Sequence, residues 1–223
     1  MIINVIQKNK ELFEANFNIV SNENVLGTIN VKGKLGSMEV FLNGTYNSIP
    51  FTFKYIGGML IKNKNKKFRP YQIIESNNVI GEIYQTNKKT GLFSGYGYNT
   101  LIFNNNIYNE YGIGLGKESK FPIYFNNIQI SQIDTESIIY NDLHNYKIYI
   151  KEDKYSLISI IFACYMYINA GFKPGIEVKK SVVKYYNKTT NKELNSKYNP
   201  EWIKDIKWGK YERKRNIKSS NTD

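Results

Sequence analysis

One uncharged stretch constrains the fold of this chain more than any other feature. Residues 155–172 read YSLISIIFACYMYINAGF, between Lys154 and Lys173. A helix that is apolar on every side must be enclosed by protein or by lipid. At about 1.5 Å per residue this helix would be about 27 Å long, which is slightly short for a membrane crossing of about 20 residues. Its Ser, Tyr and Asn residues also disfavour lipid, so we expect a core helix and no transmembrane span. The predicted core of the helix consists of Leu157, Ile158, Ile160, Ile161, Cys164 and Ile168.

The chain before this helix has the pattern of short β-strands. Apolar residues alternate with polar ones, as in Tyr146-x-Ile148-x-Ile150, and this period of two is typical of strands. Nineteen Tyr and twelve Phe residues also favour strands. Strands followed by one enclosed helix predict a mainly β fold, a closed antiparallel barrel around a central hydrophobic C-terminal helix. Further strands are expected at residues 38–42, 49–53, 58–61, 100–103 and 122–125.

An internal repeat supports a sheet built from similar units. Residues 17–29 read FNIVSNENVLGTI and residues 71–83 read YQIIESNNVIGEI. Each unit reads as a strand, a polar turn and a second strand, which is the signal of a β-hairpin. Gly27 and Gly81 occupy the same place in the two second strands. A glycine inside a strand predicts a bend or a bulge.

The chain divides by charge. Residues 1–172 form the expected barrel, and residues 173–223 form a basic extension with fourteen Lys and Arg residues against six Asp and Glu. Within the extension, residues 182–186 are expected as a strand or a short helix, and a second helix is expected at about 200–211. Asn199 supplies its capping side chain and Pro200 its first residue. We expect the Trp202 face of this helix to pack on its own domain rather than on a membrane.

Together these features resemble the tubby C-terminal-like superfamily, which includes the phospholipid scramblases and the LURP-one-related proteins. The resemblance rests on the two repeated units, on a third apolar pattern from Ile128 to Ile150, and on the apolar helix. It covers roughly residues 12–172. It implies that the chain is a small bacterial relative of this superfamily. It also implies a closed barrel of about 12 antiparallel strands around a hydrophobic helix. Tubby proteins bind phosphoinositides through basic side chains, and scramblases associate with membranes and calcium, but neither site is placed on residues of this chain.

Few residues of this chain suit catalysis or metal binding. One His and one Cys rule out the zinc sets built from several of these residues, and Cys164 is expected as a buried structural thiol. His144 lies two residues from Asp142, but the surrounding sequence predicts a turn with a solvated His. Asp134 and Glu136 alternate on one face of a possible strand, without a cleft that the sequence reveals. We expect no enzyme, no metal and no cofactor.

The net charge of +12 favours an anionic partner. We expect a non-enzymatic binding module for acidic phospholipid headgroups. The alternatives are a protein partner, as in a toxin-neutralising or scaffold protein, and nucleic acid bound through the basic extension. The candidate anion-binding residues are Lys62, Lys64, Lys66, Lys67, Arg69, Lys204, Lys207, Lys210, Arg213, Lys214 and Arg215. These cations equally suit a surface that they merely solvate.

The N-terminal sequence bears on location. MIINVIQKNK has neither a basic n-region nor an apolar core long enough for a signal peptide. We expect a cytoplasmic protein, with peripheral contact to a membrane if the lipid interpretation holds.

Overall fold

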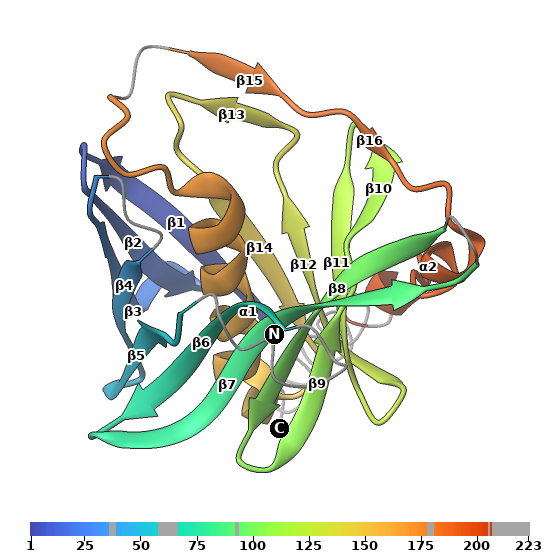
Figure 1. The fold of residues 1–223 in the computed structure, drawn as a ribbon, viewed down its shortest axis with the longest axis horizontal. Coiled ribbons are helices and arrows are strands. Elements are labelled where there is room, and N and C mark those ends of the chain that lie inside the picture. Colours follow the sequence, from blue (N-terminus) through green and yellow to red (C-terminus); the bar gives the residue numbers. More distant parts are fainter. Residues whose placement is uncertain (36–38, 58–66, 92–93, 178–180, 205, 207–223) are drawn as a thin grey trace, which may run out of the picture.

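Antiparallel strands make up most of the chain (Figure 1). The computed structural model describes residues 1–35, 39–57, 67–91, 94–177, 181–204 and 206. The first strands are β1 (Ile2–Lys10), β2 (Glu14–Ser21), β3 (Asn24–Gly33), β4 (Val40–Tyr46), β5 (Ile49–Tyr55), β6 (Phe68–Glu75), β7 (Asn78–Lys89) and β8 (Gly95–Phe103). They are followed by β9 (Asn106–Glu110), β10 (Ile113–Gly116), β11 (Ser119–Phe125), β12 (Ile128–Thr135), β13 (Ile138–Tyr140), β14 (Asn145–Ile150), β15 (Val182–Lys184) and β16 (Asn187–Lys188). The helices are η1 (Asp153–Tyr155), α1 (Ser156–Met166), the π-helix η2 (Tyr167–Gly171) and α2 (Lys192–Asn195).

Twelve of these strands close into one antiparallel barrel. Strands β1 to β9 pair in chain order, and β9 then pairs with β11. β12 pairs with β11 on one edge and with β14 on the other, and β14 returns to β1. Closure removes the free edges that would otherwise recruit other strands. The predicted mainly β fold and closed antiparallel barrel are therefore confirmed, with the expected number of strands.

Five hairpins at one end of the barrel share one turn geometry. In each hairpin both central residues have positive φ, for example 49° at Asn22 and 69° at Glu23. Two consecutive left-handed residues form a type I′ turn, whose twist matches that of the two strands. Asn tolerates this backbone better than most residues. The five pairs are Asn22 and Glu23, Asn47 and Ser48, Ser76 and Asn77, Asn104 and Asn105, and Asn126 and Asn127.

The two repeated sequence units form the hairpins β2–β3 and β6–β7, as predicted. In each second strand one residue bulges out of register directly before the glycine. The glycine also allows a close backbone approach. A Cβ atom on Gly27 would lie 1.9 Å from the carbonyl oxygen of Thr45, and one on Gly81 would lie 2.6 Å from that of Ile102.

The apolar segment forms α1 and continues as η2. The backbone of α1 lies close to strands β1, β8, β12 and β14. The ring of Tyr165 also packs edge-on against Tyr71 of β6, and the ring of Tyr167 against Phe17 of β2. Both helical elements share one hydrophobic core with the inward side chains of the strands.

The burial of the predicted helix core follows from this packing. Leu157 is partly buried against the core, and the other five predicted residues are buried: Ile158, Ile160, Ile161, Cys164 and Ile168. Burial raises the pKa of the Cys164 thiol well above its ordinary value, so this residue is the buried thiol that the sequence predicts. No helix in the described part of the chain has the length and apolarity to cross a membrane.

After the helix, the chain runs back across the barrel end (Figure 1). β15 pairs with β13, and β16 pairs with β10. α2 is capped by the Asn191 side chain and buries Leu194 beside Tyr96 and Ile113. This part of the extension is thus held against the barrel by backbone pairing and by a small apolar cluster.

The predicted second helix is described only in its first turn. The Asn199 side chain accepts a hydrogen bond from the Glu201 amide at 3.0 Å, as a capping residue does. The indole nitrogen of Trp202 donates to the carbonyl oxygen of Gln129 at 3.1 Å, so this residue packs on the barrel. Residues 207–211 of the predicted helix lie outside the described residues.

Candidate functional site

A pocket of about 540 Å³ opens at the barrel end opposite the five tight turns. We call it the mouth pocket. Its wall comes from strand ends far from those turns and from the C-terminal end of the helix, residues 169–171. Amide side chains line it from several elements: Gln85, Asn99, Asn145, Asn169 and Asn187. Such a concave site with converging polar groups is the usual form of a small-molecule site.

Glu110 is the central feature of the mouth pocket. It ends β9, where Tyr108 and Glu110 both point inward because side chains alternate along a strand. Glu110 is only 2% exposed, and its Oε1 atom accepts a hydrogen bond from Asn99 Nδ2 at 3.1 Å. Its Oε2 atom is buried and has no hydrogen-bond partner among the described residues. Burial raises the pKa of Glu110 to about 8, and the bond from Asn99 lowers it only in part.

Asn145 supplies a second buried oxygen without a partner. Its Nδ2 atom donates to Glu136 Oε1 at 3.3 Å, while its Oδ1 atom is buried and unpaired within the described ranges. The described part of the chain has three buried side-chain atoms of this kind, and two of them belong to residues that line the mouth pocket. Buried polar groups are normally hydrogen-bonded. The strand register places Asn145 on the outward face of β14 with Lys147, and Glu110 on the inward face of β9. The two oxygens therefore mark two separate places where a donor would complete the hydrogen bonding.

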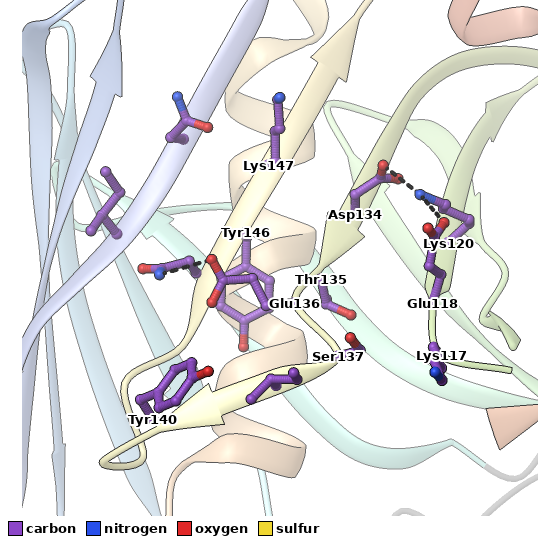
Figure 2. Close-up of a pocket in the computed structure, with 14 residues that line it drawn as sticks. Lys117, Glu118, Lys120, Asp134, Thr135, Glu136, Ser137, Tyr140, Tyr146 and Lys147 are labelled. Atoms are coloured by element: carbon purple, nitrogen blue, oxygen red, sulfur yellow. Dashed lines mark hydrogen bonds and ion pairs between the residues drawn. The ribbon is translucent and has the colours of Figure 1, made fainter. Parts of the chain in front are cut away.

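A second hollow of about 800 Å³, which we call the outer groove, adjoins the mouth pocket. Six residues line both spaces: Lys117, Thr135, Glu136, Ser137, Asn145 and Tyr146. Figure 2 shows the groove, with Glu136 near Tyr146 and with Lys120 beside Asp134 and Glu118. Lys120 lies 2.8 Å from Asp134 and 3.0 Å from Glu118. Its charge is neutralised by two carboxylates, which makes the groove a poor anion site at this point.

The end of the helix shapes the floor of the mouth pocket. η2 is a π-helix, a form that is found mostly as short insertions and often at functional sites. The guanidinium Nη1 of Arg69 donates to the carbonyl oxygen of Asn169 at 2.7 Å, and both residues line the pocket. The Tyr167 hydroxyl accepts a bond from Gln7 at 3.2 Å. These contacts hold the helix end against β6 and β1.

His144 also lines the mouth pocket, and the prediction of a solvated His was wrong. Its side chain is 12% exposed, and Nε2 lies 3.3 Å from Asp142 Oδ1. Burial lowers the pKa of His144, against the opposing effect of Asp142. The residue is buried because the helix end covers it, with the backbone of Gly171 so close that a Cβ there would lie 3.2 Å from the imidazole ring. The sequence around His144 predicted only a turn, and it carried no sign that the helix end would pack over this residue.

Three of the predicted anion-binding residues are described, Lys67, Arg69 and Lys204, and they do not share one site. Lys67 is paired with Glu82 at 2.8 Å, and Lys204 with Glu201 at 2.7 Å. Arg69 is the described candidate that lines the mouth pocket. The remaining candidates lie outside the described residues: Lys62, Lys64, Lys66, Lys207, Lys210, Arg213, Lys214 and Arg215.

The sequence interpretation missed Glu110, the residue that defines the pocket. The available signal was the alternation in NIYNE, residues 106–110, which places a carboxyl at an inward position after Tyr108. Asp134, which the sequence singled out, is paired with Lys120 instead. Across the described residues, no three His, Cys, Asp or Glu side chains gather as metal ligands would.

Comparisons with known proteins add no relative. A scan against protein-family models found no match, and neither did searches of curated proteins and of solved structures.

Proposed function

We propose that this protein is a non-enzymatic binding module that holds a small polar ligand in the mouth pocket. The observation that carries the proposal is Glu110, a buried carboxyl that lines a pocket of about 540 Å³ and has one oxygen without a partner among the described residues. A buried polar group without a hydrogen bond destabilises the fold. A bound molecule that donates to Oε2 of Glu110 would supply the missing hydrogen bond.

Binding is a better fit than catalysis because of what surrounds Glu110. Its described hydrogen-bond partner is an amide, Asn99, which orients the carboxyl without exchanging a proton. In the nearest match to a catalytic pair, His144 with Asp142, burial lowers the pKa of His144, and the two side chains are 3.3 Å apart. General acid–base catalysis needs a titrating group within hydrogen-bond reach of the substrate proton that it moves. The amide-rich wall instead offers donors and acceptors for recognition.

The proposal includes a tubby-like architecture with the helix at the centre of the barrel. It is supported by the burial of α1, where only Leu157 and Met166 are partly exposed. It is also supported by contacts from η2 and α1 to β2, β6 and β12, which lie far apart around the ring. In this arrangement the helix fills the barrel and its C-terminal end forms the pocket floor. The site therefore depends on the same packing that holds the fold together.

A test of binding uses a blocked pocket. Ala170 is exposed and lines the opening, so Ala170→Trp should fill it without disturbing the core. The matched control is Ile128→Trp, at a 62% exposed site beside the tight turns. The measurement is saturation-transfer NMR with a mixture of small amines, polyols, amides and phosphates.

We expect some of these compounds to bind the wild type and the control, to lose binding in Ala170→Trp, and to remain chemically unchanged. Absence of any binding, or equal binding by the blocked variant, contradicts the proposed site. Conversion of a bound compound contradicts the non-enzymatic part.

A second candidate function is the binding of acidic phospholipid headgroups, and Arg69 and Lys117 favour it because both line the mouth pocket. Clustered cations bind phosphate through charge-assisted hydrogen bonds. The test is co-sedimentation with phosphatidylserine or phosphoinositide vesicles, against neutral vesicles, at low and physiological salt. Arg69→Gln should weaken binding to acidic vesicles, while Lys154→Gln, at an exposed lysine paired with Glu152, serves as the matched control. If the wild type ignores acidic vesicles even at low salt, the lipid candidate fails.

A further inference from the structure

We infer that the mouth pocket binds a neutral polyhydroxylated ligand, such as a sugar or a polyol, whose hydroxyl groups meet an inward row of three polar side chains. The row consists of Gln85 of β7, Asn99 of β8 and Glu110 of β9, and all three line the pocket. This inference rests on the proposed function and names the ligand class of the same site.

The first step is that these three side chains lie side by side on the inner face of the barrel. The strand register places Gln85 opposite Asn99, and Asn99 opposite Glu110. Directly opposite residues of antiparallel strands lie on the same face of a sheet. That face is the inner one, because side chains alternate along a strand and the residues two positions away belong to the core: Ile83, Leu101 and Tyr108. Since neighbouring strands are about 4.8 Å apart, one small ligand can reach the whole row.

The second step concerns the hydrogen bonds that the row leaves open. Glu110 is 2% exposed, and its Oε1 atom accepts a bond from Asn99 Nδ2 at 3.1 Å, while Oε2 has no partner among the described residues. Burial raises the pKa of Glu110 to about 8, so the carboxyl holds a proton at neutral pH. Because Oε1 accepts from Asn99, the proton makes Oε2 a donor that needs an acceptor. The amides of Gln85 and Asn99 add further donors and acceptors beside it.

The groups that surround Glu110 are neutral at this pH. Tyr146 of β14 and Tyr165 of α1 interact electrostatically with it, and burial raises the pKa of both phenols. Its neighbours on the adjacent strands are Asn99 of β8 and Ile123 of β11. Burial and the bond from Asn99 are the influences on the pKa of Glu110, and no cation among the described residues is one of them.

The charged side chains of the mouth pocket are exposed or engaged elsewhere. The guanidinium of Arg69 donates to the Asn169 carbonyl oxygen at 2.7 Å, and Lys117 and Glu136 are exposed. Burial lowers the pKa of His144, so its ring is mostly neutral at pH 7. The inner wall therefore offers a ligand no fixed charge from the described residues. The remaining titratable lining residues are two exposed tyrosines: Tyr185 and Tyr186.

The third step matches this wall to a chemical class. Two hydroxyls also line the pocket, on Ser119 of β11 and Thr135 of β12, which face each other across their strands. A ligand hydroxyl both accepts and donates, so it can accept from Oε2 of Glu110 and donate to an amide oxygen of the row. The rings of Phe121 and Tyr146 line the same pocket and offer apolar surface to the C–H groups of a sugar. A ligand with several hydroxyls and no charge fits this set.

A charged ligand fits less well. An ammonium ion would bind well only after Glu110 loses its proton, which reduces the affinity at neutral pH. An anion would lie beside the carboxyl without a described inward cation to balance it. A metal ion that prefers oxygen requires several carboxylate or carbonyl ligands, and no three His, Cys, Asp or Glu side chains gather in the described part of the chain.

The inference makes a defined statement about protons. A neutral ligand leaves the proton on Glu110, so binding between pH 6 and 7 should exchange about zero protons with the solvent, and the affinity should change less than about twofold. A cation that binds the ionised carboxyl would instead release about one proton and gain about tenfold in affinity over the same interval. The two cases are therefore separated by measurement.

The experiment uses the full-length protein with methyl glucopyranoside, methyl galactopyranoside and xylitol as probes. Tetrahydropyran-2-methanol keeps a sugar-like ring with one hydroxyl, and propylamine and acetate supply the two charges. Dissociation constants are measured by NMR titration at pH 6 and 7, and proton exchange by calorimetry in buffers of different ionisation enthalpy. These comparisons need the wild type alone.

Three variants test the row itself. Glu110→Leu removes the hydrogen bonds of the carboxyl and keeps an apolar side chain of similar size. Glu110→Gln keeps an acceptor for Asn99 and places an amide donor where the protonated Oε2 atom stands. The matched control is Glu82→Leu, which removes a partly exposed carboxylate paired with Lys67. A cooperative thermal melt shows that each variant is folded.

We expect at least one polyhydroxylated probe to bind at least about tenfold more tightly than tetrahydropyran-2-methanol, propylamine and acetate, without proton exchange. Glu110→Leu should lose at least about tenfold in that affinity, Glu110→Gln should recover most of the loss, and Glu82→Leu should match the wild type. Release of about one proton overturns the inference, as does unchanged binding by Glu110→Leu.

The remaining outcomes separate the ligand class from the binding function. If amines, amides or phosphates bind, Ala170→Trp abolishes their binding, and no sugar or polyol binds, the polyhydroxyl assignment fails and the proposed function stands. Sugar binding that is equal in Ala170→Trp and the wild type places the site elsewhere and overturns both. If no compound binds at all, both fail.

Discussion

Asn99 and Glu110 face each other across strands β8 and β9, and the amide of Asn99 donates to one oxygen of the Glu110 carboxyl at 3.1 Å. The other oxygen is buried without a partner among the described residues. The same carboxyl therefore affects both the stability of the barrel and the proposed binding of a ligand. It costs the fold stability when ionised, and it gives the mouth pocket its chemical character.

The first prediction is that Glu110 makes the fold less stable as the pH rises. Burial raises its pKa from 4.5 to about 8, so the native state holds a proton that the unfolded state loses above pH 4.5. Stability attributable to this group is therefore present below pH 4.5, falls between pH 4.5 and 8, and is constant above that range. At about 1.4 kcal/mol per pKa unit, the total loss is several kcal/mol. Urea unfolding at pH 5, 7 and 9 measures it.

Glu110→Gln should remove this dependence. The variant should match the wild type to within about 1 kcal/mol at pH 5 and be clearly more stable at pH 9. Glu82→Gln, at a partly exposed ion pair, should follow the wild-type curve. A wild-type curve without the fall, or a Glu110→Gln curve with it, would show that the carboxyl is solvated.

The second prediction concerns His144, whose pKa is lowered by burial. Because the unfolded state takes up a proton below pH 6.5 more readily than the native state, stability should fall as the pH drops below that value. His144→Asn in a Glu110→Gln background should flatten the curve between pH 6.5 and 5. Measuring in this background separates the effect of His144 from the opposite effect of Glu110. An unchanged slope would mean that His144 is accessible to water.

The third prediction is that a charge in the middle of α1 prevents folding. Ile160 is fully buried, and a buried Asp without a partner costs several kcal/mol, a large part of the 5–15 kcal/mol by which typical domains are stable. Ile160→Asp should therefore yield insoluble or non-cooperatively melting protein. Val25→Asp, at a 59% exposed site, is the control and should fold normally. A soluble Ile160→Asp protein with a cooperative melt would contradict a helix enclosed by the barrel.

The fourth prediction concerns Gly27. A Cβ at this position would lie 1.9 Å from a backbone oxygen that cannot move independently of the sheet. Gly27→Ala should destabilise the protein by a few kcal/mol, because close-packed interiors do not absorb such a clash. At Gly97 the nearest atom to an added Cβ is the end of the Gln85 side chain at 2.9 Å, which can rotate away. Gly97→Ala should therefore cost much less, and thermal melting of the two variants compares them directly. Equal melting temperatures would mean that the strands near Gly27 can separate freely.

Local sequence features determined the elements of this fold. The alternation of apolar residues predicted most strands, and the repeat predicted the hairpins β2–β3 and β6–β7, because turn geometry and period are properties of neighbouring residues. The Asn residues at the turns are also a local feature, because they adopt the positive φ that a tight turn requires. The uncharged segment likewise predicted a buried helix, since apolarity on every side leaves few other places for it.

The mouth pocket depended on long-range packing. Glu110, Asn145 and Arg69 are far apart in the chain, and they line one pocket because β12 pairs with both β11 and β14 and thereby closes the ring. The same closure places His144 under the helix end, and among the described residues it gives Glu110 no ion-pair partner. Periodicity shows only that Glu110 points inward. Whether a carboxyl that points inward finds a partner depends on which strands become neighbours, and this was decided only by the tertiary structure.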